Sequence, residues 1–111
     1  MIALNRLTPQ FNVGQIVKHR RYGYRGVVVA IDLVCKAPRA WYERNQTQPD
    51  RNQPWYHVIV DQSETTTYPA QTSLLADDSG NRNISNPMMK LFFGSFENGR
   101  YIRNAVPFRS W

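Results

Sequence analysis

The sequence predicts a mostly β protein, a small β-barrel of about five antiparallel strands followed by a short C-terminal helix and an extension. Two runs of residues carry this prediction. Residues 13–29 contain a strand-like stretch, a turn with glycines at Gly23 and Gly26, and a β-branched run that continues to Ile31, as is typical of a hairpin. Residues 53–61 place aromatic and apolar side chains on both faces of a strand. Because neither face is freely solvated, both runs are expected to pack into one seam of the barrel.

The first half of the chain is predicted to hold a lead, one hairpin and a long loop. Residues 1–10 have no periodicity and are expected to form a flexible lead. A strand is predicted at 13–19, a turn at 20–24 and a longer strand at 26–33. Apolar residues occupy both faces of the longer strand, which is therefore predicted to lie centrally in the sheet. Residues 36–54 combine prolines with Asn, Gln, Arg and Asp, and this composition predicts a loop that is either mobile or functional.

A second hairpin completes the sheet. Residues 55–61 form its first strand, and the threonine-rich residues 65–68 form its second after a short polar turn. A short last strand is predicted at 73–75, before a polar loop at 77–81. The β part of the chain is therefore expected to end near residue 76.

The C-terminal part is predicted to hold a short helix. Asn86 followed by Pro87 is typical of a helix start, with Asn86 as the N-cap and Pro87 at the first helical position. Residues 96–111 are too apolar for a free tail, so they are expected either to wrap back over the barrel or to contact another subunit. The predicted organisation is a lead at 1–10, a barrel at 11–76 and a C-terminal helix with a packing extension at 77–111.

Length and composition point to one globular domain. The chain has 111 residues, of which 41% are hydrophobic and 20% charged, and this balance argues against general disorder. No apolar run approaches the roughly 20 residues that a membrane-spanning helix needs, and the first residues lack a signal-peptide pattern. The only cysteine, Cys35, has no internal disulfide partner. We therefore expect a cytoplasmic protein without a membrane partner.

The net charge of +6 is unevenly distributed along the chain. Residues 1–44 carry +6, residues 45–80 carry −4 and residues 81–111 carry +4, and arginine outnumbers lysine eleven to three. Guanidinium groups suit bidentate pairing with phosphate, so this surface is compatible with a nucleic-acid partner. The alternative that the arginines only keep the protein soluble stays open, and the acidic segment would repel DNA wherever it shares a face with the basic residues.

Groups that could support catalysis are scarce. The chain has two histidines and one cysteine, and it contains no Gly-rich phosphate loop, HExxH or GxSxG motif. A thiol nucleophile at Cys35 or a metal site built from His19, His57 and Cys35 is disfavoured, because Cys35 ends an apolar strand and structural zinc needs four ligands. We therefore expect no enzymatic activity, no metal and no cofactor.

The main candidate site is the turn between the first two strands. Cations on this turn can reach phosphates while a tyrosine braces them, and the alternative is a solvated hairpin tip. The predicted DNA-binding residues are Lys18, His19, Arg20, Arg21, Tyr22, Tyr24 and Arg25.

A second set of residues could form an aromatic binding face: Trp41, Tyr42, Trp55 and His57. Only one face of the strand at 55–61 is expected to be exposed, and Tyr56, Val58 and Val60 are assigned to the interior. His57 is predicted either to donate a hydrogen bond to the backbone or to a carboxylate, or to contact a ligand.

A specific combination of motifs links the chain to a known family. The matching residues are Phe11-Asn12-Val13-Gly14-Gln15, His19, Tyr22-Gly23-Tyr24-Arg25-Gly26-Val27-Val28, Ile31-Asp32, Gln53-Pro54-Trp55-Tyr56-His57-Val58 and Tyr68. With them, residues 11–75 resemble the hemimethylated-DNA-binding, YccV-like domain of the family that includes the bacterial heat-shock protein HspQ. The end of the chain looks more like the longer version found in certain eukaryotic F-box proteins.

The resemblance implies an SH3-like, strongly bent β-barrel and two activities, neither of them catalytic. One is binding of DNA methylated on one strand, which would need arginines on phosphates and an apolar or aromatic contact to the adenine N6-methyl group. The other, linked to the stress response, is service as a specificity factor for an ATP-dependent protease, with that protease or its substrates as partners. A third hypothesis is an interaction domain with neither activity. The oligomeric state stays open.

Overall fold

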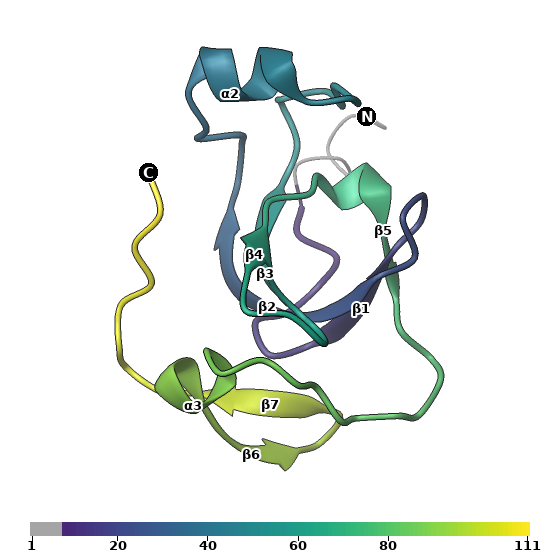
Figure 1. Cartoon of the computed structure of the whole chain (residues 1–111), viewed down its shortest axis with the longest axis vertical. Coiled ribbons are helices and arrows are strands. Elements are labelled where there is room, and N and C mark those ends of the chain that lie inside the picture. The colour runs from purple at the N-terminus through teal and green to yellow at the C-terminus, as the bar shows by residue number, and fades with distance from the viewer. Residues whose placement is uncertain (1–7) are drawn as a thin grey trace.

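The structure, a computed structural model, describes residues 8–111 and consists of a bent five-stranded antiparallel sheet with a separate C-terminal hairpin packed beneath it (Figure 1). The sheet order is β4-β3-β2-β1-β5. Its strands are β1 (Ile16–His19), β2 (Arg25–Asp32), β3 (Trp55–Val60), β4 (Thr66–Thr67) and β5 (Leu74–Ala76). The mostly β fold and the central position of the longest strand are thus confirmed.

The sheet bends without closing into a complete barrel. The two edge strands, β4 and β5, are not paired with each other. The register between β2 and β3 shifts between Val28 and Ala30, and such a bulge increases the local bend and twist of a strand. β1 begins at Ile16 rather than at residue 13, because the backbone N–H of Gln15 donates to the carbonyl of Asn12 in a turn.

Two glycines allow close backbone contacts that fix this shape. A Cβ on Gly26 would lie 2.5 Å from the carbonyl oxygen of Ile59 on the neighbouring strand. Gly14 has a φ of +90°, and a Cβ there would collide with the carbonyl oxygen of Tyr101. The backbone N–H of Tyr101 donates to the Gly14 carbonyl, so the C-terminal hairpin contacts the sheet directly at this glycine.

Both faces of β3 are buried, as its apolar pattern predicts, and the assignment of Trp55 to an exposed binding face is therefore wrong. Tyr56 and Val58 pack with Phe11 and Leu74 on one side. On the other side, Trp55 is only 1% exposed. The expected exposure of Trp55 is wrong because its face of the strand is covered by the segment that follows β2, together with the C-terminal layer.

A short helix, α2 (Arg39–Arg44), lies in the segment that was expected to be a loop. Trp41 and Tyr42 on this helix both make edge contacts with the Trp55 ring, at centroid distances of 6.3 Å. No side chain caps the helix at its N-terminus, so its own sequence gives little start signal. The helix is thus stabilised by packing of its aromatic residues, which a local pattern does not reveal.

A 3-10 turn, η1 (Gln71–Ser73), precedes β5. The C-terminal layer comprises α3 (Met89–Phe92), β6 (Phe93–Glu97) and β7 (Arg100–Arg103). It differs from the prediction in where its helix begins and in the presence of a hairpin. The helix begins at Met89 with Met88 as its N-cap, so the prediction of Asn86 as the N-cap is wrong. The Asn86 amide instead donates to the carbonyls of Val60 and Thr65, which ties this residue to the sheet. Asn86 still accepts the N–H of Met88 through its side chain.

The β6–β7 hairpin was not predicted, although its turn carries a recognisable signal. Asn98 and Gly99 both have positive φ angles, 54° and 85°, as a two-residue type I′ turn requires. An Asn-Gly pair between β-forming residues is the strongest short-range hairpin signal. Residues 96–103 thus wrap back under the sheet as strand rather than as an irregular extension.

The first described residues are tied to the sheet, so residues 8–10 of the expected flexible lead are held by hydrogen bonds. The Gln10 N–H donates to the Tyr56 hydroxyl and to the Gln71 amide oxygen, and the Gln71 amide donates to the carbonyl of Thr8. The rest of the expected lead, residues 1–7, lies outside the described residues. Within residues 8–111, no helix has the length and apolar character needed to span a membrane.

Candidate nucleic-acid interface

The β1–β2 turn is organised from within by His19. Its Nδ1 atom accepts the backbone N–H groups of Arg21 and Tyr22, at 3.1 and 3.0 Å. The backbone of His19 is also bonded to Tyr24 and Gly23, and Gly23 has the positive φ, +77°, that the turn needs. His19 is itself buried, so it supports the turn rather than presenting its ring to solvent.

Three cations of the predicted site lie at this hairpin, with Lys18 on β1 and Arg20 and Arg21 on the turn that follows it. Lys18, Arg20 and Arg21 are exposed. The guanidinium of Arg21 lies 5.8 Å from the centre of the Tyr22 ring, a cation–π contact. Within residues 8–111, none of the three forms an ion pair with a carboxylate. Their charge is therefore available to an anion from outside the chain.

The aromatic residues of the turn form a stack. The Tyr22 ring lies 4.6 Å from the His19 ring at an interplanar angle of 23°, and the Tyr24 ring lies 5.1 Å from His19 on a similar incline. The outermost ring, Tyr22, is 51% exposed, whereas Tyr24 is partly buried and its hydroxyl bonds to Thr67 at 2.7 Å. Tyr22 thus ends the stack with an accessible aromatic face.

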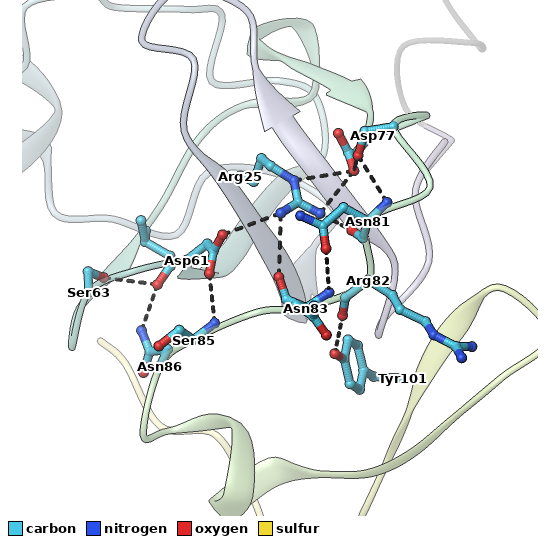
Figure 2. Close-up of polar contacts among 12 residues, drawn as sticks. Arg25, Asp61, Ser63, Asp77, Asn81, Arg82, Asn83, Ser85, Asn86 and Tyr101 are labelled. Carbon is cyan, nitrogen blue, oxygen red and sulfur yellow. Dashed lines mark hydrogen bonds and ion pairs between the residues drawn. The ribbon is translucent and has the colours of Figure 1, made fainter.

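Arg25 lies opposite Lys18 in the β1–β2 pair but differs from the other three cations in its ion pairs, which Figure 2 shows. Its guanidinium pairs with Asp61 at 3.3 Å and with Asp77 at 3.2 Å, and only 18% of its side chain is exposed. It also donates to the carbonyls of Asn81 and Asn83. Arg25 therefore joins β2 to the segment after β5 and has no free donor face comparable with that of Arg20.

Further hydrogen bonds connect the contacts of Arg25 to the C-terminal layer, as Figure 2 shows. Asp61 accepts the N–H of Ser85 at 2.7 Å, and the Tyr101 hydroxyl donates to the carbonyl of Arg82. Because the charged Arg25 guanidinium binds two carboxylates and two carbonyls, its role is to hold these segments together. The segment from 77 to 86 is thus fixed to the sheet although it contains no regular element up to residue 86.

The predicted aromatic face is divided between core and surface. Trp41 and Tyr42 are partly buried, and Trp41 also contacts Trp111 near the C-terminus, at a centroid distance of 5.4 Å. His57 is buried, with its Nε2 atom 3.1 Å from Asp32. The arrangement thus places His57 beside a carboxylate, as one of the two sequence-based readings anticipated.

Asp32 also accepts a hydrogen bond from the Tyr68 hydroxyl, at 2.6 Å. The Tyr68 ring stacks on His57 at 4.4 Å. Burial, together with the hydrogen bond to Asp32, raises the pKa of the Tyr68 phenol well above its usual value. The phenol is therefore a hydrogen-bond donor at neutral pH.

Burial lowers the pKa of both His19 and His57 below the usual value of 6.5, and for His19 the nearby Arg21 acts in the same direction. For His57 the contact with Asp32 opposes the shift, but burial has the larger effect. Both imidazoles are therefore neutral in the folded protein at neutral pH. A neutral His19 can accept the two N–H groups that shape the turn.

We expect the free energy of unfolding to decrease as the pH falls through 6.5. In this range the unfolded chain binds more protons than the folded chain, because the folded pKa values of His19 and His57 are lowered. Urea midpoints followed by tryptophan fluorescence at pH 7.5, 6.5 and 5.5 measure the effect, since ordinary carboxyl groups stay ionised there. The variant His19→Gln/His57→Gln should show a flatter profile. A wild-type midpoint that rises toward pH 5.5 would contradict the prediction.

A cleft of about 310 Å³ opens beside the turn. Its lining includes the rings of His19, Tyr22 and Tyr24 at the turn and residues of α2 and the chain after it, and the Tyr22 hydroxyl bonds to Gln46 between these two groups. The other lining residues are Trp41, Asn45, Gln46, Thr47, Pro49, Trp55, Thr66, Thr67, Tyr68, Pro69, Ala70 and Ser73. The sequence predicted residues 36–54 only as a loop that is either mobile or functional. It could not place them beside the turn, because the contacts between the two segments are long-range.

The described residues contain no cluster of three or more His, Cys, Asp or Glu side chains placed to hold a metal ion. Cys35 is a buried free thiol beside Ala37 and Trp55. Its surroundings are apolar, and such a thiol packs as a small hydrophobic group.

Comparison with known proteins agrees with the resemblance seen in the sequence. A family model described as hemimethylated DNA-binding protein YccV like matches residues 9–100. F-box only protein 21 from Pongo abelii and from Homo sapiens is 31% identical over 98 residues, and the Mus musculus protein is 30% identical over the same length. These matches cover 86% of this chain but only 15–16% of the relatives, so the similarity concerns one part of much longer proteins.

Proposed function

The chain belongs to the YccV-like family of hemimethylated DNA-binding proteins, and we propose that it binds DNA through the β1–β2 turn without catalysing a reaction. Lys18, Arg20 and Arg21 contact backbone phosphates in this proposal, and Tyr22 braces them. His19 and Tyr24 act from behind, as the inner members of the ring stack. The turn is a narrow hairpin tip, and a two-stranded ribbon fits the major groove of B-DNA.

One observation carries the proposal: the cations of the turn have no carboxylate partner within residues 8–111, whereas several other arginines are already engaged. Arg25 pairs with two aspartates, Arg39 pairs with Glu43, Arg51 donates to the Ala37 carbonyl, and Arg103 donates to the Val29 carbonyl. Exposed guanidinium groups without a partner are suited to phosphate oxygens.

The acidic segment at 45–80 is less of an obstacle than its charge suggests. Asp61 and Asp77, two of its five acidic residues, are paired with Arg25. Their side chains are 12% and 7% exposed, so they contribute little free negative surface. Repulsion of DNA by this segment is correspondingly reduced.

We propose that the preferred DNA carries an N6-methyl group on adenine in one strand. The experiment is a titration of one duplex prepared unmethylated, hemimethylated and fully methylated, over a range of salt concentrations. The hemimethylated duplex should bind tightest, and three phosphate contacts predict a slope of log K against log salt of about −2.7. Equal and weak binding of the three duplexes would overturn this preference.

A protein-interaction role is the second candidate, with an ATP-dependent protease or its substrates as the partner. It is supported by the half-exposed Trp111 against Trp41 and by the occurrence of the matched region within much longer relatives. A contact anchored by aromatic residues depends weakly on salt, whereas phosphate binding depends on it steeply. Absent DNA binding in the titration above would move this role to first place.

A further inference from the structure

We propose that the cleft beside the β1–β2 turn, hereafter the ring cleft, receives a single nucleobase that has left the stack of the bound DNA. This inference rests on the proposed DNA-binding function and adds a second contact to it. The turn would hold the phosphates, and the ring cleft would hold the base of a nucleotide beside them. Proteins that read an unstacked base combine aromatic stacking with hydrogen bonds to the base edges.

The walls of the ring cleft offer the chemistry that a base requires. The half-exposed Tyr22 ring and the partly buried Trp41 ring both line the cleft. Tyr68 also lines it, but its ring is buried against His57, so Tyr22 and Trp41 are the rings left for a base. Aromatic faces of this kind stack on any base. The amides of Asn45 and Gln46 lie at the same cleft, and Asn or Gln can pair with adenine through both a donor and an acceptor.

A single exposed hydrogen bond joins the turn to the chain after α2 at the ring cleft. The Tyr22 hydroxyl donates to the Gln46 side-chain oxygen at 3.0 Å, and both residues are exposed. The amide nitrogen of Gln46 donates to no described group. An exposed hydrogen bond exchanges readily with water, so a base can displace it at low cost and use the same groups.

The wall that faces the turn is held in place before any ligand arrives. The Tyr42 hydroxyl donates to the carbonyls of Gln48 and Pro49, and the Gln48 amide donates back to the carbonyl of Glu43. The Arg51 guanidinium packs 4.9 Å from the Tyr42 ring centre and donates to the Ala37 carbonyl. A wall fixed by these contacts needs little further ordering on binding.

Size and charge favour a base over other small ligands. A volume of about 310 Å³ is at the lower end for ligand pockets, which suits one ring system rather than a helix or a duplex. No Asp or Glu occurs among the lining residues, and Arg20 and Arg21 stand nearby on the turn. A methylated ammonium ion would therefore meet rings without a counter-charge, whereas a base attached to a phosphate backbone finds cations on the adjacent turn.

The test compares a fully paired duplex with the same duplex carrying one central mismatch. Unpairing lowers the cost of extruding a base, so the protein should bind the mismatched duplex about tenfold more tightly. In Thr47→Phe, which fills the ring cleft, and in Gln46→Ala, this ratio should fall below about threefold. Asn52→Ala removes an exposed amide outside the lining and should keep the full ratio. Urea unfolding of each variant verifies that it is folded.

The outcomes separate this inference from the proposed function. Arg20→Ala/Arg21→Ala should weaken binding of both duplexes by the same factor and leave their ratio unchanged. A ratio near one in the wild type, or a ratio that Thr47→Phe leaves unchanged, overturns the ring cleft as a base site while DNA binding stands. Failure to bind either duplex overturns both proposals. Binding of a proline-rich peptide in the cleft together with a ratio near one would assign it to a protein partner instead.

Discussion

Replacing Arg20 and Arg21 by alanine is expected to weaken DNA binding about 100-fold at low salt, or about 2.7 kcal/mol. Both guanidinium groups are exposed and have no carboxylate partner within residues 8–111, so their full charge is available to phosphates. Loss of two phosphate contacts should also make the slope of log K against log salt less negative by about 1.8. Fluorescence anisotropy with one labelled duplex at four salt concentrations measures both quantities.

The matched control is Lys90→Ala/Arg100→Ala, which removes the same amount of charge. Lys90 is exposed on α3 and Arg100 is exposed on β7, in the layer beneath the sheet and away from the β1–β2 turn (Figure 1). This control should lose less than about threefold, since its cations lie away from the proposed contact. Equal losses in the two double variants would mean that net charge alone drives binding. Undiminished affinity in the folded Arg20→Ala/Arg21→Ala variant would remove the turn from the site.

The part of the fold that could be predicted is the part that local patterns encode. Apolar residues on both faces place β2 in the centre of the sheet, and the glycines at 23 and 26 predict the first hairpin. α2 could not be predicted because its stability comes from Trp41 and Tyr42 packing on Trp55, which lies more than ten residues further along the chain. The β6–β7 hairpin was predictable in principle from its Asn-Gly turn.

The candidate site was only partly predictable, for a related reason. The basic character of the β1–β2 turn is local, so Lys18, Arg20 and Arg21 could be selected from the sequence. Arg25 and Trp55 have the same residue types as good binding groups, but their partners come from distant segments that a pattern does not bring together. The ring cleft likewise joins residues near 22 and near 46, and only the tertiary structure shows this contact.

Arg25→Ala is expected to lower the free energy of unfolding by about 4 kcal/mol, a large fraction of the stability of a small domain. The change removes one guanidinium and leaves Asp61 and Asp77, which are 12% and 7% exposed, without their cation. The carbonyls of Asn81 and Asn83 lose a donor at the same time. Urea unfolding followed by tryptophan fluorescence measures the loss, and a loss below about 1 kcal/mol would mean that the network behaves as an ordinary surface pair.

Two further variants separate the structural role of Arg25 from a phosphate contact. Arg25→Ala/Asp61→Asn/Asp77→Asn removes the stranded carboxylates and should recover about half of the lost stability, because unpaired buried charge is the main cost. Arg25→Lys keeps the charge but not the planar fork that reaches two aspartates, so it should lose about 2 kcal/mol. If Arg25 serves only to bind Asp61 and Asp77, the folded Arg25→Lys variant should bind DNA with the wild-type salt slope and affinity. A weaker affinity with an unchanged fold would return Arg25 to the DNA-binding residues, since only a direct contact with the ligand depends on the guanidinium shape in that way.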